Sequence, residues 1–161
     1  VFTNADLKIE AEPLVEFFNV LVHLFRNCLD HGIEDSYTRT NSGKSSDGHI
    51  GVSFSEFSEN ERKFLSVTIE DDGAGIDPQK IRNKLYNMNP EEDFSQVSDR
   101  DIIYKIFDPF FSTRDEVTLL SGRGVGMSAI KDVVDKLGGQ IEIESHVNRG
   151  STFNFVIPMS F

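Results

Sequence analysis

Cysteine, tryptophan and long apolar stretches are scarce in this sequence. Its 161 residues include one cysteine, Cys28, which excludes an internal disulfide and a zinc site built from several cysteines. The neighbours of Cys28 are apolar, so we expect a buried, unreactive thiol. There is no tryptophan, and no apolar run reaches the ~20 residues of a membrane span. With no signal-peptide pattern, the expected compartment is the cytoplasm.

Basic residues are also few. Sixteen Lys and Arg residues face 27 Asp and Glu residues, giving a net charge of −11. This balance excludes a general nucleic-acid surface, which needs a basic stripe, and disfavours an anionic membrane face. A length of 161 residues fits one domain with a substantial core. We therefore treat residues 1–161 as a single domain, whose abrupt start at Val1 suggests that it comes from a longer protein.

Apolar periodicity predicts four helices and several strands. The helices are expected at 13 to about 31, 78 to about 87, 99–106 and 125 to about 137. The strands are expected at 50–57, 64–70, 140–145 and 152–157, with a short edge strand possible at 7–11. Residues 35–48 are interpreted as a polar loop, and 107–124 as irregular.

This order of elements favours an α+β fold. Strands in consecutive pairs indicate a mixed, mostly antiparallel sheet, covered by helices on one face in a two-layer sandwich. The strict alternation of strands and helices that a doubly wound parallel sheet requires is not seen.

The first predicted helix has a polar face beside its apolar stripe. His23, Asn27, Asp30 and His31 recur at spacings of three and four, which places them along one side of the helix. An amide oxygen in such a group can bind a magnesium ion that is held mainly by phosphate oxygens. The alternative is an ordinary solvated helix face, which is common.

The segment Asp71-Asp72-Gly73-Ala74-Gly75-Ile76 follows a predicted strand directly. The strand delivers a carboxylate into a turn whose glycines permit close approach or positive φ. Asp71 would then accept a hydrogen bond from an exocyclic amine such as adenine N6. The alternative is an acidic turn that caps the next helix.

A third motif, Gly122-Arg123-Gly124-Val125-Gly126-Met127, opens the last predicted helix. Alternating glycines at a helix N-terminus expose backbone N–H groups to an anion. Residues 124–129 also match the dinucleotide pattern G-x-G-x-x-A, but no strand precedes them. The absence of a G-x-x-x-x-G-K-[ST] motif excludes a P-loop protein.

Between these motifs lies a segment rich in phenylalanine. Residues 107–114 read FDPFFSTR, and aromatic residues beside glycines suggest a mobile lid over about 107–124. The alternative is an ordinary loop held in place by its phenylalanines.

Together the four motifs, in this order, resemble the GHKL group of ATP-binding domains. Within that group the sequence is most similar to the catalytic ATP-binding domain of histidine kinases, which adopts the Bergerat fold. Residues 21–34, LVHLFRNCLDHGIE, look particularly like chemotaxis kinases of the CheA type, as do 111–114 and 121–127. The resemblance covers about residues 14–158.

The resemblance implies roles for individual residues. Asn27 would hold Mg²⁺ against the phosphates of ATP, with His23 and His31 near the phosphate chain. Asp71 would bind the adenine N6, and Arg123 or Arg114 would neutralise the β- or γ-phosphate. His23, Asn27 and Arg123 would form the catalytic group. The implied nucleotide-binding set is Asn27, Asp30, His31, Asp71, Gly73, Gly75, Ile76, Arg114, Gly122, Gly124, Val125, Gly126, Met127, Ser151 and Thr152.

The resemblance also implies what lies outside this domain. The γ-phosphate would pass to a phosphoacceptor histidine on a separate domain and then to a response regulator, with no nucleic acid and no membrane contact in this domain. Two alternatives stay open. A GHKL ATPase would carry a glutamate one turn before the magnesium Asn, where this sequence has His23. A non-catalytic nucleotide sensor would bind ATP without transfer. Because the domain is acidic, local bases such as Lys84, Arg26 and Lys131 would attract the nucleotide.

Overall fold

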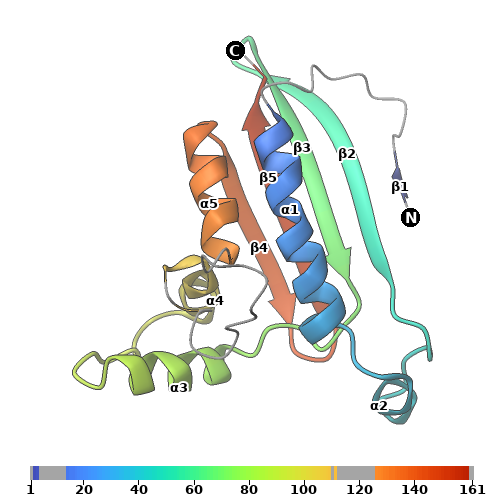
Figure 1. Cartoon of the computed structure of the whole chain (residues 1–161), viewed down its shortest axis with the longest axis vertical. Helices are drawn as coiled ribbons and strands as arrows, with labels where there is room; N and C mark the ends of the chain where they lie inside the picture. The colour runs from blue at the N-terminus through green and yellow to red at the C-terminus, as the bar shows by residue number, and fades with distance from the viewer. Residues whose placement is uncertain (1, 4–13, 110, 112–125, 160–161) are drawn as a thin grey trace.

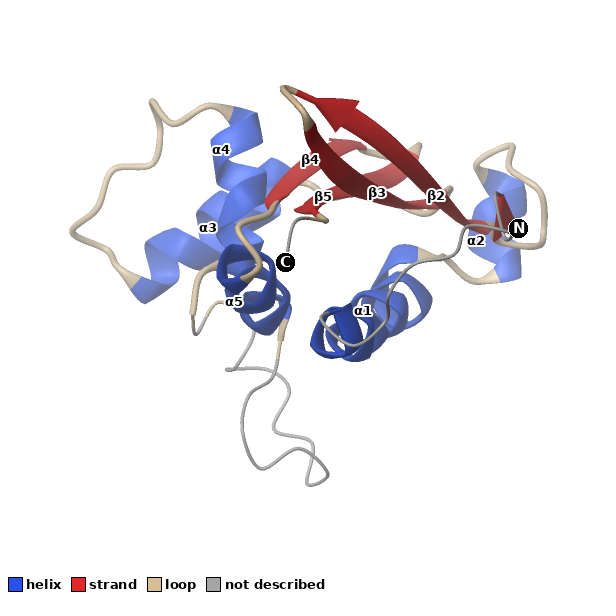
Figure 2. Ribbon diagram, turned by 90° about the horizontal axis from the view of Figure 1, so that it is seen from above, coloured by secondary structure: helices blue, strands red, loops and turns tan. Residues whose placement is uncertain are grey.

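The computed structural model describes residues 2–3, 14–109, 111 and 126–159. They form a sheet with helices on one side, so the α+β two-layer sandwich predicted from the sequence is confirmed (Figures 1 and 2). The helices α1 (Val15–Asn27) and α5 (Met127–Lys136) pack against the same face of the sheet. In the described part of the chain, no helix has the length and apolar character that crossing a membrane requires.

The sheet is mixed and mostly antiparallel, as expected. Its strands are β1 (Phe2–Thr3), β2 (Ile50–Glu59), β3 (Arg62–Asp71), β4 (Gln140–His146) and β5 (Gly150–Pro158). They are arranged in the order β1-β2-β3-β5-β4, in which the β1 and β2 pair alone is parallel. The predicted edge strand at 7–11 lies outside the described residues.

The hairpin between β2 and β3 is tighter than the predicted strand ends, 57 and 64, imply. Asn60 and Glu61 both have positive φ, 48° and 64°, and they form the two-residue turn. Two residues in this left-handed region match the turn type whose twist fits a hairpin. The strands therefore continue to Glu59 and from Arg62.

The predicted helices are found with small changes at their ends. After α1 the chain continues into a π-helical turn, η2 (Cys28–Gly32). The other predicted helices are α3 (Pro78–Met88) and α4 (Asp99–Tyr104), the latter extended by the 3₁₀ turn η3 (Lys105–Phe107). The N-terminus of α3 has the expected chemistry: Pro78 opens it, and the Asp77 carboxylate accepts from the Gln79 N–H at 2.8 Å.

The prediction of a continuous loop at 35–48 is wrong. It contains a short helix, α2 (Ser36–Asn41), capped by Asp35, which accepts from the N–H groups of Tyr37 and Thr38 at 3.0 Å each. The buried residue of this helix is Arg39, with no apolar stripe beside it. Apolar periodicity misses the helix because a polar cap and a buried cation hold it in place.

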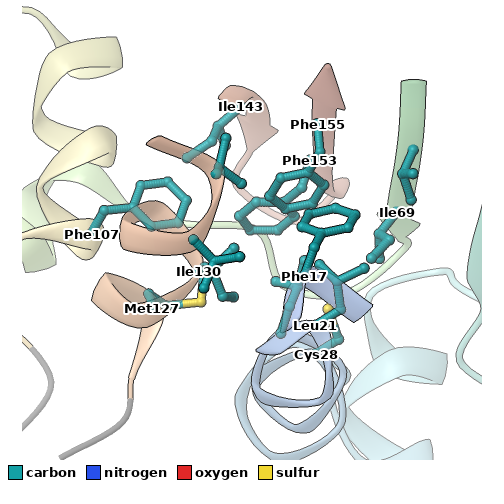
Figure 3. Packing of buried hydrophobic residues seen from close by; sticks show 14 of the residues in the cluster. Phe17, Leu21, Cys28, Ile69, Phe107, Met127, Ile130, Ile143, Phe153 and Phe155 are labelled. Carbon is teal, nitrogen blue, oxygen red and sulfur yellow. The ribbon is translucent and has the colours of Figure 1, made fainter. Parts of the chain in front are cut away.

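The core lies between the sheet and the helices that cover it. Alternate residues of β3 and β5 point toward α1 and α5, which gives the buried set Leu65, Val67, Ile69, Phe153, Phe155 and Ile157. Phe17 of α1 contacts Phe155 edge to face, with ring centroids 5.5 Å apart (Figure 3). This packing fixes the C-terminal ends of α1 and β3 at one end of the molecule (Figure 1).

We expect Phe17→Ala to lower the free energy of unfolding by about 3–5 kcal/mol, because it opens a cavity in a fully buried aromatic pair. Urea denaturation monitored by circular dichroism measures the change. Val22→Ala, on the exposed side of the same helix, is the matched control and should shift stability by no more than about 0.5 kcal/mol. Similar losses for both variants would contradict the assigned core.

Candidate functional site

A pocket of about 420 Å³ opens where α1, η2, α3 and α5 meet the ends of β3 and β5. Its volume lies within the range of small-molecule sites. Most of its exposed wall is apolar and comes from residues such as Leu24, Ile81 and Phe153. A few polar side chains interrupt this wall, and this pattern is typical of a site that binds a small molecule or cofactor.

The pocket brings together residues from several of the sequence motifs. The predicted site residues that line it are Asn27, His31, Asp71, Gly75, Ile76, Met127 and Ser151. They come from the helix face, the turn after β3, the start of α5 and the start of β5. Asn27 and Ser151 are 124 positions apart in the sequence, and they line the same pocket.

Other predicted residues are described but do not line the pocket. They are His23, Asp30, Gly73, Gly126 and Thr152. Strand alternation explains why Thr152 does not line the pocket. Ser151 and Phe153 face the helices, so Thr152, which lies between them, faces the opposite side of the sheet. His23 lies one turn before Asn27 and is half-buried, whereas Asp30 is exposed.

The remaining predicted residues lie outside the described part of the chain. They are Arg114, Gly122, Arg123, Gly124 and Val125. Most of the predicted lid, 107–124, lies there too, but Phe111 is described and lines the pocket. The position of Phe111 in the wall of the pocket agrees with an aromatic segment packed beside the site.

Asp71 lies at the end of β3 with only 9% of its surface exposed. Its Oδ1 accepts from the Gly73 N–H at 2.9 Å, and the Cys28 thiol donates to its Oδ2 at 3.8 Å. Burial raises the pKa of Asp71 above the ordinary carboxyl range. Burial, reinforced by the negative charge of Asp71, raises the pKa of the Cys28 thiol to about 12. Cys28 is therefore a protonated thiol at neutral pH, as the sequence led us to expect.

The turn after Asp71 is packed so closely that side chains would not fit. A Cβ on Gly73 would lie 2.1 Å from the Gly32 carbonyl oxygen. Gly75 has φ +69°, and a Cβ there would lie 2.2 Å from the carbonyl oxygen of His146. The Ala74 N–H donates to the Gly32 carbonyl at 2.8 Å, so the turn is joined directly to the end of η2. These contacts explain both glycines of the D-x-G-x-G pattern.

Two lysines of α3 also line the pocket. Lys80 and Lys84 are four residues apart, so they project from one side of the helix. The Lys84 ammonium lies 4.9 Å from the centre of the Phe111 ring. Lys84 is one of the local bases expected from the sequence, whereas Lys80 was not predicted. The signal for Lys80 was its i, i+4 spacing from Lys84 after the helix start at Pro78.

A buried polar cluster lies behind the turn, and the sequence patterns do not predict it. Arg39 is fully buried and makes ion pairs with Glu34 and Asp72, at 3.2 and 2.7 Å, while Lys44 pairs with Glu34 at 2.7 Å. No carboxylate–histidine cluster suited to holding a metal by protein ligands alone occurs among the described residues.

Comparison with known proteins places this geometry in a family. Residues 17–160 match the family model described as histidine kinase-, DNA gyrase B-, and HSP90-like ATPase. The chain belongs to this family of ATPase domains. Membership confirms the resemblance on which the sequence interpretation rests, and makes ATP the expected nucleotide of the pocket.

Individual relatives of this ATPase domain are named for motility and chemotaxis. The domain is 39% identical to the gliding motility regulatory protein of Myxococcus xanthus, over 99% of this chain and 20% of that protein. It is 37% identical to the chemotaxis protein CheA of Halobacterium salinarum, over 99% of this chain and 24% of that protein. The ATPase domain thus spans about a fifth to a quarter of the length of these relatives.

Solved structures agree on the fold. The catalytic domain of histidine kinase ThkA, in a nucleotide-free form, matches with a TM-score of 0.54 and 23% identity. The match covers 98% of this chain and 74% of that one. At this level of identity the likeness supports the sandwich architecture.

Because the pKa of Asp71 is raised in the folded state, its neutral form is favoured there, and the associated stability is lost as pH rises through that pKa. Asp71→Asn cannot ionise and escapes this loss. We expect the difference in melting temperature between Asp71→Asn and the unmodified domain to change in favour of the variant from pH 4 to pH 8 in thermal unfolding measurements.

Asp72→Asn is the control of opposite sign. Burial alone would raise the pKa of Asp72, but hydrogen bonds from the His49 N–H and the Arg39 guanidinium outweigh it and lower the pKa. The ionised Asp72 carboxylate stabilises the fold at pH values above the pKa that Asp72 has in the unfolded chain. This stabilisation is lost as the pH falls through the lower pKa that Asp72 has in the folded domain. Asp72→Asn should therefore be more damaging at pH 7 than at pH 4, and the same trend for both variants would contradict the assignment.

Proposed function

We propose that this domain binds ATP with Mg²⁺ in the pocket and donates the γ-phosphate to a histidine on a separate domain of a two-component system. One observation carries the proposal. A buried carboxylate, Asp71, shares a single pocket with the polar helix face that contributes Asn27 and His31. The pocket thus offers a hydrogen-bond acceptor for a purine amine and an oxygen ligand for a phosphate-bound cation.

The purine would lie at the Asp71 end. An exocyclic amine donates to a carboxylate, and the Cys28 thiol is a weak donor that lies 3.8 Å from Oδ2 of Asp71. Gly75 and Ile76 would lie against one face of the ring, and Gly73 would hold Asp71 in place from behind. Ser151, which also lines the pocket, would contact the base through water; Thr152 faces away and is the weaker of the two candidates.

The phosphates would lie toward Asn27 and α3. Asn27 would supply a protein oxygen to Mg²⁺, which neutralises phosphate charge when bound. His31 lines the same wall, and His23 and Asp30 flank it on α1 and η2. Lys80 and Lys84 add positive charge, which the domain needs because its net charge of −11 repels a nucleotide.

The glycine motif before α5 would complete the phosphate site. Gly122, Gly124 and Gly126 would present backbone N–H groups together with Val125 and Met127, while Arg123 or Arg114 would neutralise the β- or γ-phosphate. Met127 lines the pocket at the first turn of α5, which supports this placement. Phosphoryl transfer depends mainly on such positioning and charge neutralisation.

The acceptor and later partners are proposed from the relatives. Proteins named chemotaxis protein CheA and sensor histidine kinase CheAY match this domain at 35–39% identity. We infer a phosphoacceptor histidine domain, in the same or a partner chain, and a downstream response regulator. A cytoplasmic setting follows from the same inference.

Two other functions are possible for this family and make different predictions. A hydrolase would need a carboxylate to activate water, and His23 occupies the position one turn before Asn27 where we expect a glutamate in such ATPases. A non-catalytic nucleotide sensor would bind ATP without transferring phosphate. The kinase is favoured because of His23 and the kinase relatives.

We expect isothermal titration calorimetry to detect Mg-ATP binding at micromolar to millimolar affinity. Asp71→Asn should abolish binding because it places an amide donor against the adenine amine, and Asn27→Ala should remove the Mg²⁺ dependence. Asp135→Asn, which alters an exposed ion pair on α5, is the matched control and should bind normally. Unchanged binding by Asp71→Asn would overturn the adenine assignment.

Phosphotransfer is tested with the domain, radiolabelled ATP and an acceptor-histidine domain from a relative. We expect acid-labile label on the acceptor and slow steady-state phosphate release by the domain alone. Fast phosphate release would instead identify an ATPase. ATP binding without label on any acceptor domain would identify a sensor.

A further inference from the structure

The turn that carries Asp71 is held from behind by a polar cluster whose two cations lie outside every sequence motif. We define the clamp as Glu34, Arg39, Lys44 and Asp72. Arg39 is fully buried, and Lys44 is half-buried, with 15% of its side chain exposed. The two cations belong to the segment 35–48, which lies outside the pocket wall. Buried cations of this kind need a structural or functional reason, because their desolvation is expensive.

The clamp contacts the backbone of the turn at two successive carbonyl oxygens. The Asp72 carbonyl accepts from Lys44 Nζ at 2.9 Å and from Arg39 Nη1 at 3.2 Å. The Gly73 carbonyl accepts from Lys44 Nζ at 2.6 Å. Lys44 therefore joins the Asp72–Gly73 and Gly73–Ala74 peptide units.

Each of these peptide units is also fixed on its opposite side. A trans peptide is planar, so its N–H points away from its carbonyl. The N–H of Gly73, in the same unit as the Asp72 carbonyl, donates to Asp71 Oδ1 at 2.9 Å. The N–H of Ala74, in the next unit, donates to the Gly32 carbonyl at 2.8 Å. Fixing the two carbonyls thus aims one N–H at the Asp71 carboxylate and the other at the end of η2.

The rest of the clamp keeps the cations in place. Glu34 accepts from Lys44 at 2.7 Å and from Arg39 at 3.2 Å. Burial by itself would raise the pKa of Glu34, but its hydrogen bond from Lys44 and the nearby positive charges outweigh this and lower it, so Glu34 is ionised at neutral pH. The Asp72 carboxylate accepts from Arg39 Nη2 at 2.7 Å and from the His49 N–H at 2.8 Å.

We propose that Lys44 and Arg39 are positioning residues for nucleotide recognition, acting on Asp71 through the Asp72–Gly73 peptide unit. The inference rests on the proposed function for its consequence in ATP binding, but the contact itself is independent of any nucleotide. Lys44 and Arg39 do not line the pocket. They orient the peptide whose N–H donates to Oδ1 of Asp71, while Oδ2 accepts from Cys28.

Lys44→Met tests the proposal, since methionine keeps much of the length and removes the charge and all three donors. Lys44 lies at the edge of the clamp, so this variant is more tolerant than Arg39→Met, which would leave buried carboxylates unpaired. Lys63→Met is the matched control: Lys63 pairs with Glu56 at 3.1 Å on the far hairpin.

The first measurement needs no ligand. The Gly73 N–H lowers the pKa of Asp71 against the effect of burial, so a loosened peptide should raise that pKa further. A carbon-13 NMR titration of the aspartate carboxyls should show this rise in Lys44→Met and no change in Lys63→Met. An unchanged pKa in Lys44→Met, with the fold intact, would overturn the proposal.

The second measurement is the affinity for Mg-ATP by calorimetry. Lys44→Met should weaken binding about tenfold, the effect of one misplaced hydrogen bond to a charged group, whereas Lys63→Met should bind normally. A lower melting temperature with unchanged ATP affinity would mean a purely structural role and would overturn the proposal.

The two measurements separate this inference from the proposed function. If the unmodified domain does not bind ATP but Lys44→Met shifts the Asp71 pKa, the proposed function fails and the positioning contact stands. If Asp71→Asn abolishes ATP binding while Lys44→Met changes neither quantity, the proposed function stands and the positioning role fails.

Discussion

The arrangement depends on one buried carboxylate, Asp71, at the end of a central strand. A carboxylate in an apolar pocket is tolerated only where donors meet it, and here a backbone N–H supplies the stronger contact and a thiol the weaker. The glycine turn, the end of η2 and the ion pairs behind the turn all follow from that requirement.

The net charge of the domain and the charges that line the pocket act in opposite directions on an anionic ligand. The overall charge of −11 opposes an anionic ligand, yet Lys80 and Lys84 face the pocket together. Over distances longer than about 10 Å, salt screens the unfavourable field, whereas contacts inside the pocket are screened far less. Local cations can therefore dominate recognition in an acidic domain, and the acidic surface elsewhere disfavours polyanions such as nucleic acids.

The sequence predicted the fold well, because the helices and strands of the core have clear apolar periods and recognisable caps, as at Asp77 and Pro78. Its motifs also predicted much of the pocket, since Asn27, Asp71 and Met127 do meet there. The α2 helix and its Arg39 were missed because they are held by a cap and by ion pairs, which leave no periodic signal. Thr152 shows a second limit: one step along a strand reverses the face, and the motif alone does not fix that register.

The strand order has a consequence for how the domain is made. Among the described strands β5 is last in sequence, yet it lies between β3 and β4 and supplies Ser151 and Phe153 to the pocket. During synthesis β3 emerges roughly 80 residues before β5. Until β5 is made, the edge of β3 that pairs with β5 is open for pairing with another chain. The ribosome must therefore release almost the whole domain before the sheet can close, so nascent chains stalled before β5 are the species that chaperones must protect from aggregation.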